Sequence, residues 1–226
     1  MLWQWANNSI QVFILDLDGT LIPSAEIDNL CFWRAVFECF DRHDPLPDLH
    51  DFKHVTDSGI LGEWCESALG RSANDDENRQ IRRRFAELLE QSSNEPGDYY
   101  KPLAGVEEWL LAVRESPNVF AGIATGGWGH SAGLKLELSG LDKFDLPLAS
   151  SDDAIARSEI MLIAAGMVQE LHGSADAAIT YIGDGAWDFK AARVLNWDFI
   201  GIAGGDQASR LRKAGASQVR ADFTRR

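Results

Sequence analysis

The stretch Val12-Phe13-Ile14-Leu15-Asp16-Leu17-Asp18-Gly19-Thr20 places two acidic side chains at the end of an apolar run. A short apolar run that ends in polar residues is typical of a buried strand. Asp16 and Asp18 at the tip of such a strand lose hydration and repel each other, which is costly unless a cation or a shared proton balances them. A divalent metal beside a nucleophile would supply that balance, so the stretch predicts a metal-assisted site.

Two simpler interpretations fit this stretch less well. An Asp-Gly dipeptide often forms a hairpin turn, but residues 28–40 carry apolar side chains at helical spacing where the second strand of a hairpin would lie. A D-x-D start also opens the calcium loop of an EF-hand, which needs Gly at its sixth position and Glu at its twelfth. Leu21 and Ile27 occupy those positions, so the calcium loop is excluded.

The composition is that of an acidic globular chain. Its 226 residues, of which 45% are hydrophobic, suffice for one large or two small domains. The formal net charge of −14 disfavours a nucleic-acid partner, because phosphate backbones attract basic surfaces. No apolar run is long enough for a membrane span, and residues 1–9 lack the features of a signal peptide, so we expect a cytoplasmic protein with no membrane partner. The composition leaves the oligomeric state open.

Apolar runs alternate with helical patterns along the chain, which is the signature of a parallel α/β sheet covered on both faces. The runs are residues 12–15, 119–124, 146–149, 178–182 and 199–203. The first two runs are about 100 residues apart, far more than a single crossover needs. Helical patterns fill this interval, over residues 28–40, 58–69 and 75–91. We therefore predict a Rossmann-like, doubly wound core over residues 1–21 and 101–226, with a helical domain inserted at 22–100.

Four of these apolar runs end in groups suited to a metal or a phosphate. In open parallel sheets, ligands sit outside the carboxyl ends of the strands. Beyond the first run, the residues at those ends are Thr125-Gly126-Gly127, Ser150 to Asp153, and Gly183-Asp184-Gly185 followed by Asp188. One such ending could be accidental, but their repetition predicts one polar site at one edge of the sheet.

These motifs and their order resemble the haloacid dehalogenase-like hydrolase superfamily, in particular its phosphoglycolate phosphatase-like branch with a helical cap after the first strand. Residues 16–20 match the first motif, residues 123–127 the second and residues 183–188 the fourth. The inserted helices fall where the family places its cap. The third motif is normally a Lys that opens the helix after the third strand. Arg157 is the best match for it, with Lys135 as a rival.

The resemblance implies a Mg²⁺-dependent phosphatase that acts on a small phosphorylated metabolite through an aspartyl-phosphate. Asp16 would attack phosphorus, and Asp18 would protonate the leaving oxygen and then take a proton from water. The metal would be held by Asp16, the backbone carbonyl of Asp18, and Asp184. Asp188, one helical turn beyond Asp184, could reach the metal or its waters. The resemblance does not identify the metabolite.

Five further residues are candidates for binding the substrate. Thr125 would offer its hydroxyl and Gly126 its backbone N–H to a phosphoryl oxygen, since glycine permits that close approach. Arg157 would clamp a phosphate oxygen. Lys53 and His54 lie between two expected cap helices, where the family often presents a substrate-specificity loop. A strand-to-helix turn, a surface charge and a helix cap are the plainer alternatives for these positions.

Other functions remain open at this point. Residues 129–133, Gly-His-Ser-Ala-Gly, fit the nucleophile elbow of serine esterases around Ser131, and Asp152 and His172 follow in triad order. Four residues separate that elbow from its strand, which disfavours the esterase. A phosphosugar mutase of the same superfamily would share every motif above and differ in how long the aspartyl-phosphate survives water. Dehalogenases typically lack the second Asp, so Asp18 favours phosphoryl transfer.

Overall fold

The computed structural model describes residues 9–173 and 177–224. The strands in these ranges form one parallel sheet of six strands in the order β3-β2-β1-β4-β5-β6. They are β1 (Gln11–Leu15), β2 (Val119–Ala124), β3 (Leu148–Ala149), β4 (Ala178–Gly183), β5 (Asp198–Ile202) and β6 (Gln218–Arg220). This is the strand order of the doubly wound Rossmann-like fold. It confirms the fold class that the alternating pattern predicts.

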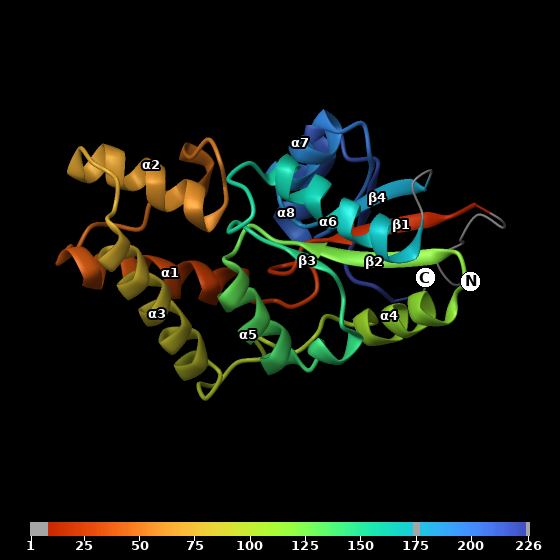
Figure 1. Cartoon of the computed structure of the whole chain (residues 1–226), viewed down its shortest axis with the longest axis horizontal. Helices are drawn as coiled ribbons and strands as arrows, with labels where there is room; N and C mark the ends of the chain where they lie inside the picture. Colours follow the sequence, from red (N-terminus) through yellow and green to blue (C-terminus); the bar gives the residue numbers. More distant parts are fainter. Residues whose placement is uncertain (1–8, 174–176, 225–226) are drawn as a thin grey trace.

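Helices connect the strands on both faces of the sheet (Figure 1). The α-helices are α1 (Ala25–Phe40), α2 (Asp57–Leu69), α3 (Asp75–Ser92), α4 (Val106–Glu115), α5 (Gly129–Ser139), α6 (Arg157–His172), α7 (Ala186–Val194) and α8 (Gly205–Ala214). Two 3-10 turns are η1 (Leu49–Asp51) and η2 (Asp142–Phe144). None of the described helices is both long and apolar enough to cross a membrane.

The two-residue period of β1 decides which helices cover which face. Phe13 and Leu15 point to one face and pack in a cluster with Trp109 of α4. Val12 and Ile14 point to the other face and pack in a cluster with helices α6, α7 and α8. The central strand is therefore buried on both sides, as its continuous apolar run indicates.

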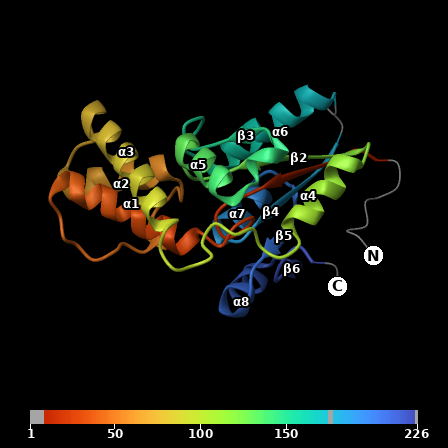
Figure 2. The same cartoon turned by 90° about the horizontal axis from the view of Figure 1, so that it is seen from below.

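Helices α1, α2 and α3 form a third apolar cluster, centred on Trp33 and Phe85. They gather at one end of the sheet, to its left in both views (Figures 1 and 2). Helix α3 contributes Ile81, Phe85 and Leu89 at four-residue spacing, and a capping box between Asn74 and Glu77 fixes its start. The division of the chain at residues 22 and 100 into cap and core stays a prediction.

The predicted elements differ from the structure mainly at their ends. Helices α1, α2 and α3 form where the sequence predicts helices. Their ends differ from the predicted ranges by no more than three residues, and the largest difference is at the start of α1. Strand β3 keeps only two residues of its predicted run. The sequence pattern missed β6, because Gln218-Val219-Arg220 is a short, mostly polar edge strand without an apolar run.

Candidate functional site

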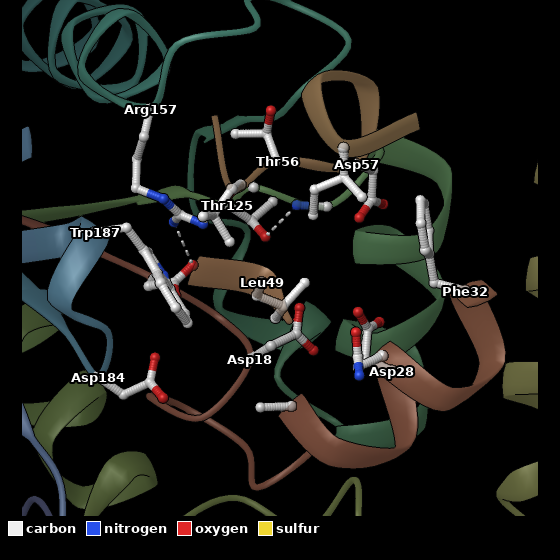
Figure 3. Close-up of a pocket in the computed structure, with 17 residues that line it drawn as sticks. Asp18, Asp28, Phe32, Leu49, Thr56, Asp57, Thr125, Arg157, Asp184 and Trp187 are labelled. Carbon is white, nitrogen blue, oxygen red and sulfur yellow. Dashed lines mark hydrogen bonds and ion pairs between the residues drawn. The ribbon is translucent and has the colours of Figure 1, made fainter. Parts of the chain in front are cut away.

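The site lies at the carboxyl ends of the three central strands. Strand β1 sits between β2 and β4, and their register sets Leu15 beside Ile123 and Ile182. Asp16, Thr125 and Asp184 lie one or two residues beyond these paired positions. They therefore come together at one edge of the sheet. Figure 3 shows Thr125 and Asp184 around one cavity, together with Asp18 and Arg157, and Asp16 lines the same cavity. The switch in strand order on either side of β1 makes this the expected ligand site of the fold.

Three carboxylates meet there. Asp16, Asp184 and Asp188 are buried, and each offers an oxygen that lies within 4.8 Å of the others. Burial, and then the charge of Asp188, hold the pKa of Asp16 well above its ordinary value. The same causes raise the pKa of Asp184 to about 7. An all-oxygen set of this kind fits a hard divalent cation, whose charge would offset the repulsion.

The surrounding residues hold these carboxylates in place. Gln207 donates from Nε2 to Asp184 Oδ2 at 2.7 Å, and the Gly185 N–H donates to Asp188 Oδ2 at 2.9 Å. Gly19 adopts a φ of +78°, and a Cβ at that position would collide with the Asp184 carboxylate. The glycine of the first motif therefore lets the loop after β1 pass close to the carboxylate of the fourth.

Arg157 lies against this cluster. It opens α6, and its Nη1 is 3.3 Å from Asp16 Oδ1 and 3.0 Å from Asp188 Oδ1. Its Nη2 donates to the Val55 carbonyl at 2.9 Å. Burial acts to lower the pKa of Arg157, but the charges of Asp188 and Asp16 raise it above its ordinary value. The guanidinium therefore remains charged and links the core to the segment before α2.

Lys135, the rival to Arg157, is placed elsewhere. It is fully buried on α5, and its Nζ lies 2.5 Å from Asp18 Oδ2 and 2.6 Å from Asp28 Oδ1. The Ser24 hydroxyl donates to the other oxygen of Asp18 at 2.5 Å. Of the two cations, Arg157 is thus the one that contacts Asp16, whereas Lys135 contacts the second Asp of the first motif.

Thr125 and Gly126 form the floor of the cavity between these groups. Thr125 is buried, and its Oγ1 accepts a hydrogen bond from the Gly127 N–H at 3.1 Å. A Cβ at Gly126 would collide with the Arg157 guanidinium and would lie 2.9 Å from the Val55 carbonyl oxygen. Only glycine fits there, because Arg157 and the Val55 carbonyl pack directly against its backbone.

Lys53 and His54 are separated from the carboxylates. The cavity around Asp16, of about 90 Å³, is lined by neither residue. Both instead line an adjoining cavity of about 240 Å³ that shares Val55, Arg157 and Trp187 with the first. Their predicted role in substrate binding stays a prediction that would require a substrate extending past Trp187.

Two cavity residues, Asp28 and Asp57, were not among the predicted site residues. Burial, and then the charge of Asp18, raise the pKa of Asp28 to about 6. Burial, and then the charge of Asp28, raise the pKa of Asp57 to about 8. A signal for Asp28 existed in the sequence, because it falls on the apolar stripe of α1 that contains Cys31, Phe32 and Ala35. Acidic residues on a buried stripe are rare unless they have a partner.

The alternative esterase residues are not arranged as a triad. Ser131 is 2% exposed, and its hydroxyl donates to the Trp128 carbonyl at 2.9 Å. Asp152 accepts from the Gly129 N–H and pairs with Arg82, while His172 stacks on Phe120. A buried serine that donates to a backbone carbonyl has no base to activate it.

Known structures share this architecture. No curated protein matches the chain. A hydrolase from Pseudomonas syringae is 25% identical, with a TM-score of 0.71 and 94% of each chain covered. A predicted phosphoglycolate phosphatase from Haemophilus somnus is 15% identical, with a TM-score of 0.62 and 96% of each chain covered. CbbY from Rhodobacter sphaeroides in complex with phosphate is 16% identical, with a TM-score of 0.66 and 95% of each chain covered.

The family follows from the sequence match over the same elements. The haloacid dehalogenase-like hydrolase model matches residues 10–196, which include β1, β2 and β4 and the residues that follow them: Asp16 and Asp18, Thr125, and Asp184. The motifs that the sequence presents in order are therefore the ones that the sheet brings to one edge, and the chain belongs to the haloacid dehalogenase-like hydrolases.

Proposed function

We propose that this hydrolase is a Mg²⁺-dependent phosphatase that cleaves a small phosphomonoester through an aspartyl-phosphate. The observation that carries the proposal is the position of Asp16. It ends the central strand, faces the cavity, and lies beside two further carboxylates and Arg157. A carboxylate fixed in this way is suited to act as a nucleophile.

The proposed reaction has two displacements at phosphorus. In the first, a carboxylate oxygen of Asp16 forms a bond to phosphorus while the bond to the leaving oxygen breaks, and Asp18 gives that oxygen a proton. In the second, water attacks the aspartyl-phosphate, the bond to Asp16 breaks, and Asp18 takes a proton from the water. Lys135 and Ser24 would hold the Asp18 carboxylate in one orientation for both steps.

The metal-binding residues in this proposal are Asp16, Asp184 and the backbone carbonyl of Asp18, with Asp188 behind them. Bound Mg²⁺ would neutralise the phosphoryl oxygens and offset the repulsion among the carboxylates. Thr125 and the Gly126 N–H would bind a phosphoryl oxygen from the opposite side. Arg157 would offset the remaining negative charge, because it already contacts Asp16.

We further propose that residues 22–100 act as a cap over this site. The start of α2 is tied to the core, since Thr56 Oγ1 donates to the Ile155 carbonyl at 2.8 Å and Ser58 Oγ donates to the Ser151 carbonyl at 3.0 Å. Arg82 of α3 also pairs with Asp152 at 2.5 Å. These contacts would keep bulk water out of the cavity during phosphoryl transfer.

The test is phosphate release from a panel of phosphomonoesters and an aryl phosphate, with Mg²⁺ or with excess chelator. We expect turnover only with the metal. Asp16→Asn should lower kcat by at least about 1,000-fold, because an amide cannot attack phosphorus. Ser131→Ala is the matched control, expected to keep turnover while losing about 1 kcal/mol of stability. Full activity in chelator, or covalent labelling of Ser131 by a fluorophosphonate with loss of activity, would overturn the proposal.

The same panel tests the peripheral residues and the alternatives. Lys53→Ala and His54→Ala should change preference among metabolites more than they change aryl phosphate hydrolysis. Chloride release from a 2-chloro acid would indicate a dehalogenase. Transfer of phosphate to an added sugar phosphate in place of release would indicate a mutase.

A further inference from the structure

The cavity around Asp16 has two walls of different chemistry. The wall formed by the strand ends carries the groups proposed to bind the phosphoryl group. The facing wall comes from α1 and the start of α2, and it presents Asp28, Asn29 and Asp57 beside Phe32 and Ile60. Figure 3 shows Asp28 and Asp57 on the same side of the cavity, across from Arg157 and Trp187. A leaving group that extends away from the phosphoryl site would meet this second wall.

Asp57 is a buried acid at the start of α2, and the charge of Lys135 only partly offsets the rise in its pKa. It is 7% exposed, and its Oδ2 accepts a hydrogen bond from the Trp128 N–H at 2.9 Å. It forms no ion pair within residues 9–173 and 177–224. One neutral hydrogen bond does not replace the hydration of a carboxylate, which is why burial raises its pKa to about 8.

The cations near the cavity are already engaged by other carboxylates. Arg157 bridges Asp16 and Asp188. Lys135 bridges Asp18 and Asp28 and does not line the cavity. Lys53 lies in the adjoining cavity. Among the residues that the structure describes, a second anionic group on the substrate would therefore meet no unengaged cation at this wall, and its charge would favour the protonated form of Asp57.

We propose that the substrate is the phosphate ester of a short amino alcohol, whose ammonium group pairs with Asp57. This inference rests on the proposed phosphatase function and adds the class of leaving group. The cavity of about 90 Å³ favours a leaving group of few atoms. An ammonium at one end and a phosphoryl group at the other would suit the two walls, because the ammonium would favour the ionised form of Asp57 and pair with it, whereas a neutral alcohol would not. A carboxylate at the same end, as in phosphoglycolate, would be disfavoured.

The first measurement compares the intact enzyme, with Mg²⁺, on phosphoethanolamine and phosphoglycolate, two esters of similar length and opposite terminal charge. We expect kcat/KM for phosphoethanolamine to be higher by at least about 30-fold, the size of one desolvated charge pair. A preference for phosphoglycolate would overturn the inference. Release of phosphate from an aryl phosphate in the same assay separates failure of this inference from failure of the phosphatase proposal. If the phosphatase proposal fails, phosphate is released neither from the two metabolites nor from the aryl phosphate.

The second measurement uses Asp57→Asn. The asparagine oxygen can still accept from the Trp128 N–H, so the start of α2 keeps its contact with the core. We expect the ratio of the two kcat/KM values to fall by about 10-fold or more, mainly through a higher KM for phosphoethanolamine. Asp75→Asn removes the same charge from the exposed first turn of α3 and should leave the ratio unchanged. An unchanged ratio in Asp57→Asn would contradict the inference; if that variant does not fold, stronger product inhibition of the wild type by glycolate than by ethanolamine would do the same.

Discussion

Arg157 and Lys135 each bridge two buried carboxylates, but they join different parts of the molecule. Arg157 contacts Asp16 and Asp188, which follow the central strands of the sheet. Lys135 contacts Asp18 in the loop after β1 and Asp28 in α1. One cation therefore lies within the edge of the sheet that carries the candidate site, and the other ties that edge to α1.

The surroundings of the two cations also differ. The Arg157 cluster consists of Arg157, Asp16, Asp184 and Asp188. Its carboxylates are proposed to bind a metal, so their negative charge is not fully balanced until a cation binds. The Lys135 cluster has no such role, and Ser24 completes the hydrogen bonding of Asp18. We infer that loss of Lys135 affects mainly stability and the orientation of Asp18, whereas a change at Arg157 affects mainly turnover.

The largest expected effect is on stability, in Lys135→Met. The substitution leaves Asp18 and Asp28 buried without their cation, which should lower the free energy of unfolding by about 3–5 kcal/mol. Adding Asp28→Asn should recover part of this loss, because it removes one of the two carboxylates. Denaturant unfolding followed by circular dichroism measures both changes.

The matched control for this experiment is Lys143→Met. Lys143 pairs with Glu107 at 2.5 Å, but both side chains are about half exposed. Exposed pairs contribute up to about 1 kcal/mol, so this variant should change stability by no more than that. Equal losses in Lys135→Met and Lys143→Met would show that burial of the Lys135 cluster contributes nothing.

The next effect is on turnover, in Arg157→Lys. A lysine ammonium keeps the charge but cannot contact Asp16, Asp188 and the Val55 carbonyl with one planar group. We expect kcat for an aryl phosphate to fall by about 10- to 100-fold, or about 1.4–2.7 kcal/mol in transition-state stabilisation. Arg34→Lys, on an exposed face of α1, controls for the exchange of residue type. Turnover at the wild-type level in Arg157→Lys would remove the guanidinium from the proposed mechanism.

The residues of the two clusters were predictable to different degrees. Asp16, Thr125 and Asp184 follow apolar runs, and a parallel sheet necessarily brings the ends of such runs together. Local sequence thus located the Arg157 cluster, including the start of α6 at Arg157. The sequence pattern did not predict β6, the outermost strand, because an edge strand of three residues needs no apolar run.

The Lys135 cluster depends on packing that local sequence does not specify. Lys135 and Asp28 are 107 residues apart, and each lies on a helix whose orientation is set by its apolar face. Asp57 likewise meets the Trp128 N–H only because the start of α2 lies against the segment that follows β2. A polar residue on a buried stripe signals that a partner exists, but the partner emerges only from the tertiary structure.

The smallest expected effect concerns how pH and Mg²⁺ act on the two clusters. Asp16 and Asp184 have raised pKa values in the folded protein, about 7 for Asp184 against 3.8 as its ordinary value. Between about pH 4 and pH 7 the folded chain therefore binds more protons than the unfolded chain, and stability in chelator should fall as pH rises.

Mg²⁺ favours the ionised carboxylates, so it should oppose this fall. At ten times its Kd it would add about 1.4 kcal/mol, or roughly 3–6 °C in Tm, near pH 7.5 and much less near pH 4.5. Thermal unfolding at both pH values, with and without Mg²⁺, measures the effect. Lys135→Met should show nearly the same Mg²⁺ increment as the wild type, because its cluster contributes only the backbone carbonyl of Asp18 to the proposed metal site. An increment that is equal at both pH values, or that disappears in Lys135→Met, would mean that the metal does not bind through the carboxylates beside Arg157.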